Sequence, residues 1–278
     1  MLKRTITSLV SICILLPVLF LSHTIALPIA IALVTCIALY EIYKCIGQNK
    51  KYYFCIPAYV FATVSPFIMR YLDKKIYLAI AFIYGATYLM YLFMVTIWQK
   101  GTVKFSKIAE LFAATLYIIA ALNSILYIRD LEGGGKYLYL LIFIGAWITD
   151  IFAYLTGMLM GKHKLIPEVS PKKTIEGSIG GTVFCVLSFV AFGIVVDTFF
   201  NTNANLIFLA VSGAFVAIVA QMGDLIMSLI KREYGIKDYG KLFPGHGGVL
   251  DRFDSILSVS LMLAIICIFA GITNISLI

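Results

Sequence analysis

Charged residues are scarce in this chain. Asp, Glu, Lys and Arg make up 13% of its 278 residues, whereas 62% are hydrophobic and the mean hydropathy is +0.99. An ordinary soluble domain has roughly 45–50% apolar and about 25% charged residues. Because a soluble core could not absorb so much apolar sequence, we predict a protein that crosses the membrane several times.

Several well-known enzyme motifs are absent as well. The six cysteines form no CxxC pair and no Cys/His pairing, and most lie in apolar runs, where cysteine behaves as a small hydrophobe. This spacing argues against a disulfide framework or a zinc site. The chain has no HExxH, Walker A or GxGxxG motif and no Ser/His/Asp triad. Its chemistry must therefore be sought in other patterns.

Long polar segments are missing, which leaves no room for a soluble domain. A spanning helix needs about 20 mostly apolar residues. Runs of this kind predict an all-α polytopic membrane protein with nine spans, at approximately 5–22, 27–44, 53–70, 76–98, 108–128, 137–160, 179–200, 205–230 and 252–273. The first run resembles a signal peptide, but no convincing cleavage site follows it, so we expect it to be retained.

The positions of the basic residues predict the orientation of these spans. The net charge is +8, and Lys and Arg lie in short clusters between apolar runs, which favours anionic lipid headgroups over nucleic acid as their partner. With a cytosolic N-terminus, 17 of the 22 basic residues fall on the inside, in residues 1–4, 44–51, 100–107, 162–173 and 231–252. The positive-inside rule therefore favours this topology.

We expect two parts, the helices of residues 1–136 and a catalytic part of residues 137–278. The second part contains two unusual cytosolic loops, at 161–178 and 231–251. The N-terminal helices carry no comparable polar segment, and we expect them to form a lipid-entry or dimer region.

Four carboxylates lie within or at the ends of apolar runs that lead to the predicted cytosolic face: Asp150, Asp224, Asp251 and Asp254. A charge inside a span is costly and usually marks a paired or functional site. Asp224 shares a helix face with Ser228, and Asp251 shares one with Asp254 at a helix start. Mg²⁺ commonly takes one or two such carboxylates and completes its shell with water and phosphates.

Glycines and cations accompany these carboxylates. The turn Gly245-His246-Gly247-Gly248 leads into a helix start, where backbone N–H groups can approach a phosphate. The other loop carries a polyanion-binding composition, with Lys162, His163, Ser170, Lys172, Lys173 and Thr174. Cations, a hard metal and a glycine turn at a membrane surface are typical of phosphoryl or nucleotidyl transfer, which needs positioning and charge neutralisation more than a covalent nucleophile.

Residues 228–254 read SLIKREYGIKDYGKLFPGHGGVLDRFD. This stretch resembles the signature of the phosphatidate cytidylyltransferases, the CDP-diacylglycerol synthases. Residues 150–157 (DIFAYLTG), 161–177 (GKHKLIPEVSPKKTIEG) and 221–225 (QMGDL) resemble the same family, so that the likeness covers about residues 147–256. Met227 departs from the pattern, because many relatives place an acidic residue before the serine.

The resemblance implies transfer of CMP from CTP to phosphatidic acid, giving CDP-diacylglycerol and pyrophosphate, with Mg²⁺ and K⁺ as a candidate second cation. It implies a homodimer, which we expect in the bacterial plasma membrane, and the positions of the basic residues predict an active site on the cytosolic face. Asp224 and Asp251 are the implied metal ligands, and we add Asp254 on helix geometry. The catalytic residues we expect are Lys231, Arg232, Lys237, Asp238, His246 and Arg252. The substrate-binding residues we expect are Asp150, Lys162, His163, Ser170, Lys172, Lys173, Thr174, Ser228, Gly245, Gly247 and Gly248.

Two alternatives stay open at this point. The first is a CTP-dependent transferase that acts on another lipid, such as an isoprenoid or an ether lipid. The second is a cation transporter, since intramembrane carboxylates such as Asp150 and Asp224, together with helices interrupted by Gly and Pro, are also features of broken-helix transporters. The absence of a repeat, and polar groups at one face rather than the midplane, disfavour the transporter.

Overall fold

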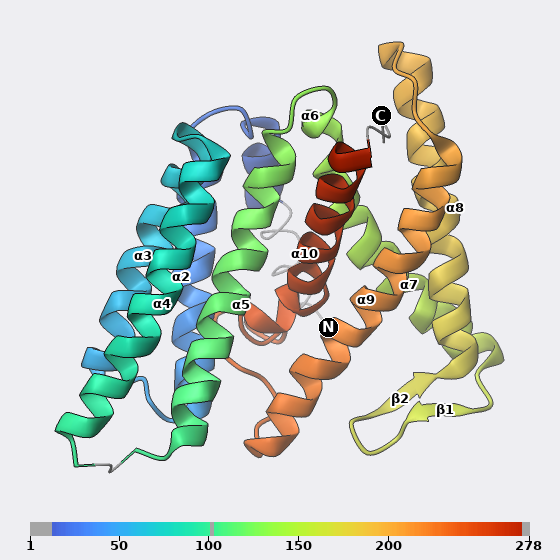
Figure 1. Ribbon diagram of the computed structural model, residues 1–278. Coiled ribbons are helices and arrows are strands. Elements are labelled where there is room, and N and C mark those ends of the chain that lie inside the picture. The colour runs from blue at the N-terminus through green and yellow to red at the C-terminus, as the bar shows by residue number, and fades with distance from the viewer. Residues whose placement is uncertain (1–12, 101–102, 274–278) are drawn as a thin grey trace. The chain divides into compact units, whose positions relative to one another are not determined.

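The computed structural model describes residues 13–100 and 103–273. Within these residues eight helical segments are long and apolar enough to cross a membrane. They are α2 (Ala26–Ile46), α3 (Tyr52–Tyr71), α4 (Lys74–Trp98), α5 (Phe105–Arg129), α6 (Gly135–Leu138) with α7 (Leu140–Met160), α8 (Ile175–Phe200), α9 (Leu206–Glu233) and α10 (Leu250–Thr273). The predicted all-α polytopic fold is confirmed (Figure 1).

These eight segments match the last eight predicted spans to within a few residues at each end. The first predicted span, 5–22, lies largely outside the described residues, although residues 13–20 are helical. The third predicted span carries Pro57 and Pro66, and both residues lie inside the single continuous helix α3.

Local sequence sets several helix ends. Gly47 ends α2 with a left-handed φ of +78°, a conformation that costs glycine least. Asp73 caps α4 by accepting the backbone N–H of Lys75 at 2.7 Å. Thr174 caps α8 in the same way, since its Oγ1 accepts the backbone N–H of Gly177 at 3.1 Å.

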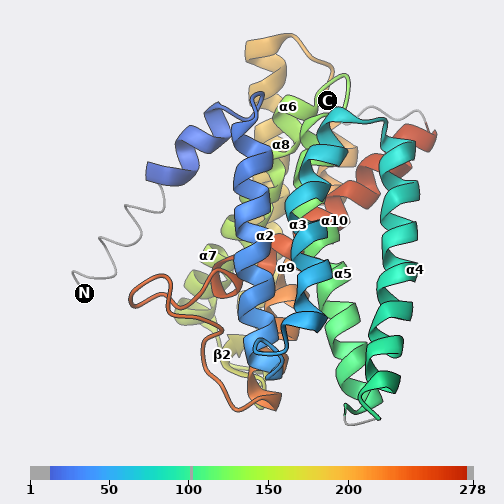
Figure 2. The same cartoon turned by 90° about the vertical axis from the view of Figure 1, so that its left-hand side faces the viewer.

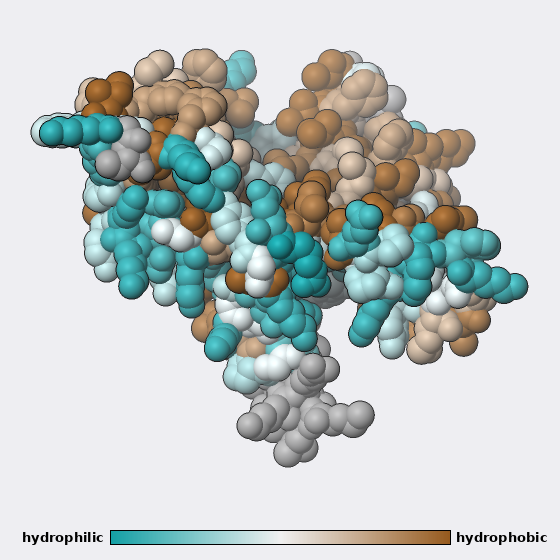
Figure 3. Space-filling model, turned by 90° about the horizontal axis from the view of Figure 1, so that it is seen from below, coloured by the Kyte–Doolittle hydropathy of each residue, from teal (hydrophilic) through white to brown (hydrophobic). Residues whose placement is uncertain are grey.

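The flanks of the helices expose large apolar side chains. Phe82 on α4 is 80% exposed, Ile179 on α8 is 60% exposed and Ile207 on α9 is 79% exposed. Contact of such apolar side chains with water is unfavourable, whereas contact with lipid chains is favourable. Hydrophilic side chains gather instead at the helix ends seen from below (Figure 3). The protein is thus an integral membrane protein.

The predicted loop 161–178 is more ordered than we expected. It contains an antiparallel hairpin of β1 (Lys164–Ile166) and β2 (Ser170–Thr174), with Lys164 paired to Thr174. A strand could not be predicted here from alternation, because the hairpin is short and has few apolar or β-branched residues. It joins the end of α7 to the start of α8 (Figure 1).

The chain forms two compact units. The first consists of Met1–Leu126 with Tyr234–Arg252, so that the glycine-rich loop belongs with the N-terminal helices. In this unit the Tyr43 hydroxyl of α2 lies 2.6 Å from the Thr115 hydroxyl of α5, and Tyr88 of α4 donates to the Phe54 carbonyl of α3. Buried hydroxyls thus join α2 to α5 and α4 to α3.

The second unit consists of Tyr127–Glu233 with Phe253–Ile278. Helices α7, α8 and α9 pack closely, and the hairpin packs against α7 and α8. The rings of Phe152 on α7 and Phe184 on α8 stack with centroids 3.9 Å apart. At Gly177 the two helices approach so closely that a Cβ atom there would lie 2.5 Å from the Ala153 carbonyl oxygen.

Replacing Gly177 with valine should therefore destabilise the second unit. We expect Gly177→Val to cost about 1–3 kcal/mol by overpacking, which lowers the melting temperature in detergent by several degrees. The matched control is Gly271→Ala, because a Cβ atom at Gly271 meets no atom within 4 Å. Equal melting temperatures for the two variants would contradict this account of the α7–α8 contact.

Candidate active site

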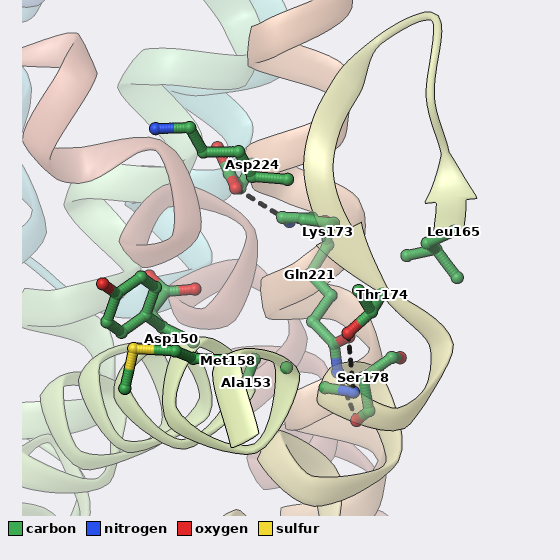
Figure 4. A pocket seen from close by; sticks show the side chains of 13 residues that line it. Asp150, Ala153, Met158, Leu165, Lys173, Thr174, Ser178, Gln221 and Asp224 are labelled. Atoms are coloured by element: carbon green, nitrogen blue, oxygen red, sulfur yellow. Dashed lines mark hydrogen bonds and ion pairs between the residues drawn. The ribbon is translucent and has the colours of Figure 1, made fainter. Parts of the chain in front are cut away.

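The second unit contains a cavity of about 400 Å³ between the hairpin and the helices α7, α8 and α9. Its polar lining includes Asp150, Lys172, Lys173, Gln221 and Asp224 (Figure 4). Apolar residues line it as well, namely Ala153, Tyr154, Met158 and Leu165. A cavity with both kinds of lining suits a ligand that has a charged and an apolar part.

The strongest polar contact in this cavity joins the hairpin to α9. Lys173 Nζ lies 2.7 Å from Asp224 Oδ2, and it also donates to the Gln221 carbonyl at 3.3 Å. Ser228 Oγ lies 3.4 Å from Asp224 Oδ1, as the i, i+4 spacing predicted. Both charged side chains stay partly exposed, at 21% and 27%, so a soluble ion can reach them.

Asp150 and Asp254 lie in the same unit, on α7 and α10. The Ser255 hydroxyl lies 3.0 Å from Asp150 Oδ2, and Asp254 Oδ1 accepts the Ser255 backbone N–H at 2.9 Å. The Asp254 carboxylate is repelled by the charges of Asp224 and Asp150 and attracted by the charge of Lys231. Three carboxylates thus share one electrostatic environment, which a cation would relieve.

The C-terminal end of α9 is basic. Lys231 and Arg232 lie in its last turn, where a positive charge interacts favourably with the helix dipole. This places them on the helix, although we expected them in the loop 231–251. Met227, which departs from the family pattern, is 2% exposed, and its apolar side chain therefore suits the core position that it occupies.

The remaining predicted residues of the second unit lie on the hairpin and its flanks. His163 Nδ1 lies 2.7 Å from Glu176 Oε1, and Glu176 also accepts the His163 backbone N–H. His163 is 73% exposed in its side chain and thus open to solvent. Lys162 and Lys172 are exposed, and Ser170 is half-buried. Thr174 is engaged as the cap of α8, so its predicted substrate contact would have to share that hydroxyl.

The first unit holds the other predicted residues, on the loop between α9 and α10. Asp251 is 6% exposed, and its Oδ2 accepts the backbone N–H groups of Tyr239 at 2.8 Å and Gly248 at 2.9 Å. Asp251 therefore folds the loop back onto the start of α10. Lys237 and Asp238 precede this fold and are exposed.

The glycine turn is closed by its own backbone. Phe243 N–H donates to the Gly247 carbonyl at 2.9 Å, and His246 N–H donates to the Phe243 carbonyl at 2.8 Å. Gly245 and Gly247 have φ values of +82° and +87°, which side chains with a Cβ rarely adopt. Arg252 Nε donates to the His246 carbonyl at 3.0 Å, which connects the turn to α10.

The loop is fastened at both ends to N-terminal helices. At its start, Tyr234 donates to Glu110 of α5, and Lys107 Nζ lies 2.5 Å from the Tyr234 oxygen and 2.9 Å from Glu110 Oε2. Burial and the hydrogen bond to Glu110 raise the pKa of Tyr234, so its hydroxyl stays protonated. At its end, the Glu41 carboxylate of α2 accepts the backbone N–H groups of Val249 at 3.0 Å and Leu250 at 2.8 Å. Figure 2 shows this loop beside the lower part of α2.

Comparison with known proteins identifies the family. Residues 2–270 match the cytidylyltransferase family. The chain belongs to that family. It is 32% identical over 266 residues to a protein of Staphylococcus epidermidis, with 95% of this chain and 98% of the relative covered. Proteins of Staphylococcus haemolyticus and Staphylococcus aureus are each 33% identical, with the same coverage, and all three are named phosphatidate cytidylyltransferase.

The donor chemistry of this cytidylyltransferase would suit a magnesium ion whose shell is completed mainly by phosphates. Among residues 13–100 and 103–273 no three Asp, Glu, His or Cys side chains are arranged to hold a metal together. Mg²⁺ needs only one or two protein carboxylates when phosphates supply the rest. Asp224 and Asp254 have hard oxygen atoms and share an electrostatic environment, so they suit such a site.

Two polar residues that connect helices or loops were not among the predicted site residues. Gln221 is 6% exposed, and its Nε2 donates to the Ser178 carbonyl, the Thr182 hydroxyl and the Ala217 carbonyl, which ties α9 to α8. Its position in the segment QMGDL was the only available signal. Glu41 gave one signal, which is a carboxylate inside the apolar run of residues 27–44.

Removing the Lys173 ammonium should loosen the hairpin. A partly exposed ion pair contributes about 1 kcal/mol at most, so we expect Lys173→Ala to speed amide exchange of residues 164–174 up to about fivefold. Lys172→Ala is the control, because it removes an equal charge from the next position on β2. If both variants exchange at the wild-type rate, the pair with Asp224 does not hold the hairpin.

Proposed function

We propose that this protein is a phosphatidate cytidylyltransferase, which transfers CMP from CTP to phosphatidic acid and releases pyrophosphate. The main structural support is the cavity of the second unit, where the side chains of Lys173 and Asp224 form an ion pair beside apolar helix surfaces. The names of the staphylococcal relatives, which the chain matches along 95% of its length, support the same activity. CDP-diacylglycerol is the product.

The Lys173–Asp224 pair would receive the triphosphate. A phosphate oxygen is a strong partner for an ammonium group, so CTP competes with Asp224 for Lys173. Lys172, next on the same strand, adds a second positive charge at the cavity. The apolar side chains Tyr154, Met158 and Leu165 offer a surface for the lipid substrate, which arrives from the bilayer.

In the reaction an oxygen of the phosphatidate phosphate attacks the α-phosphorus of CTP. A new phosphorus–oxygen bond forms while the bond between the α- and β-phosphates breaks, and pyrophosphate carries away the electron pair. No covalent intermediate on the protein is required. Lys231, Arg232, Lys237 and Arg252 are the residues we expect to offset the charge that develops on the phosphates, as cations do in phosphoryl transfer.

Asp224 and Asp254 would hold Mg²⁺, and Asp251 stays a predicted ligand whose carboxylate also holds the glycine loop. When bound, the ion supplies Lewis-acid neutralisation of the phosphate oxygens. K⁺ stays the candidate second cation. Asp238 and His246 stay predicted catalytic residues, and Ser228, Gly245 and Gly247 stay predicted substrate contacts.

We place the reaction on the cytosolic face of a bacterial plasma membrane and expect a homodimer. Both loops with the predicted residues belong to the set of segments that carries 17 of the 22 basic residues, which the positive-inside rule assigns to the cytosol. The family resemblance supports the dimer. Labelling of single cysteines with a membrane-impermeant reagent tests the face, and light scattering in detergent tests the dimer.

The decisive assay uses radiolabelled CTP with detergent-solubilised protein and phosphatidic acid, with and without Mg²⁺. We expect labelled CDP-diacylglycerol and pyrophosphate only when the lipid, the nucleotide and the metal are all present. A panel with isoprenoid phosphates and ether lipids measures the choice of acceptor. Product from those lipids but not from phosphatidic acid would contradict the proposed substrate, and ion flux without CTP would point to a transporter.

Replacing either metal-site carboxylate by its amide should nearly abolish this activity. We expect Asp224→Asn and Asp254→Asn to lower kcat at least about 100-fold, because an amide oxygen binds a hard cation weakly and cannot balance its charge. The measurement is CDP-diacylglycerol formation against Mg²⁺ concentration.

Asp73→Asn serves as the control for the Asp→Asn change. Asp73 caps α4, and asparagine caps helices as well as aspartate does. Its activity should stay at the wild-type level. If Asp224→Asn keeps a kcat near that of the wild type, Asp224 is not a metal ligand. The same result for Asp254→Asn would show that Asp254 is not a metal ligand.

A further inference from the structure

We propose that Glu41, on the N-terminal helix α2, is a positioning residue for the glycine-rich loop and its side chains Asp251 and Arg252. This inference rests on the proposed function, because it assigns those side chains to the transfer reaction. It extends the active machinery to residues 1–140, a part of the chain where the family resemblance carried over no functional residue.

The burial of Glu41 is the first observation. Its side chain is 3% exposed on a helix of high hydropathy, and a buried carboxylate is costly unless donors surround it. The donors are two backbone N–H groups of the loop, from Val249 and Leu250, one to each carboxylate oxygen. Lys44, one turn further along α2, adds a favourable charge. Glu41 thus binds a segment more than 200 residues away in the sequence.

Two glycines of the signature make room for Glu41. A Cβ atom at Gly240 would collide with Glu41 Oε1, and one at Gly248 would collide with both oxygens of the same carboxylate. The sequence suggested that glycine at 248 lets a phosphate approach the backbone. The structure supplies a second reason, which is that the loop closes around a carboxylate from α2.

Glu41 and Asp251 form one arrangement. Together they accept four backbone N–H groups of the loop, from Tyr239 and Gly248 to Asp251 and from Val249 and Leu250 to Glu41. Their negative charges repel each other, so the amide donors are needed by both. Because Gly248 and Val249 are adjacent, a shift of either carboxylate moves the backbone that holds the other.

The contacts of Glu41 with the loop also affect the positions of the predicted catalytic side chains. Leu250 is the first residue of α10, and Asp251 and Arg252 follow it at once. Arg252 in turn holds the turn through the His246 carbonyl. A misplacement of about 1 Å at a reacting group can cost about 100-fold in rate. Loss of the Glu41 carboxylate should therefore lower the rate although Glu41 itself touches no reacting atom.

The test compares Glu41→Gln with the wild-type protein. The amide keeps the size of the side chain, but it has one acceptor oxygen for two N–H donors. We expect kcat to fall at least tenfold while the KM values for CTP and phosphatidic acid change less than threefold. Amide exchange of residues 239–250 should rise about tenfold, and exchange in α3 and α4 should stay unchanged. Kinetics are measured on the folded, monodisperse fraction.

Thr35→Val is the matched control. Thr35 lies on the same helix and is fully buried, but its hydroxyl donates to the Ile31 carbonyl of α2 itself. It should leave both kcat per folded protein and loop exchange unchanged. If Glu41→Gln is not recovered folded, Glu41→Asp, which keeps the charge but shortens the reach by one methylene, is measured in the same way.

The outcomes separate the two proposals. Wild-type kcat and wild-type loop exchange in Glu41→Gln would overturn the positioning role, as would a loss of activity that merely follows the folded fraction. Faster loop exchange without any change in kcat would also overturn it, since the loop would then be held for stability alone. Absence of CDP-diacylglycerol with the wild-type protein would instead refute the proposed function.

Discussion

A carboxylate on a membrane helix requires hydrogen-bond donors or a cation, and most of the polar contacts described in this protein supply one or the other. Glu41 and Asp251 take backbone amides of the glycine-rich loop, Asp150 takes the Ser255 hydroxyl, and Asp224 takes the Lys173 ammonium. The contacts of Glu41, Asp150 and Asp224 bring together segments that are distant in sequence. In a chain with so few charges, these contacts determine where loops can lie.

The two units meet this requirement in different ways. In the first unit the donors are main-chain N–H groups, which are fixed in number and direction, and the loop folds around Glu41 and Asp251. In the second unit the main partner of Asp224 is a lysine side chain on a hairpin, which can move to another anion. Fixed main-chain donors are suited to holding a loop in place. An ion pair that can exchange its partner is suited to binding a phosphate.

The sequence alone was sufficient for much of the architecture. Apolar runs of about 20 residues predicted eight helices that the described residues contain, because a spanning helix must satisfy its own backbone and expose apolar side chains. The motif residues led to the family and to Asp150, Lys173 and Asp224, which line one cavity. The hairpin of residues 164–174 was missed, since three- and five-residue strands carry too little alternation to be recognised.

Composition and local pattern determined what kind of protein this is: an all-α membrane protein whose polar residues gather at helix ends and whose motifs belong to the cytidylyltransferases. These properties depend on residues near one another in the chain. Only the tertiary structure showed that Glu41 closes the signature loop, that Gly240 and Gly248 leave space for it, and that Lys173 pairs with Asp224. Such contacts join residues some 50 to 200 positions apart, and no local periodicity encodes which buried carboxylate meets which donor.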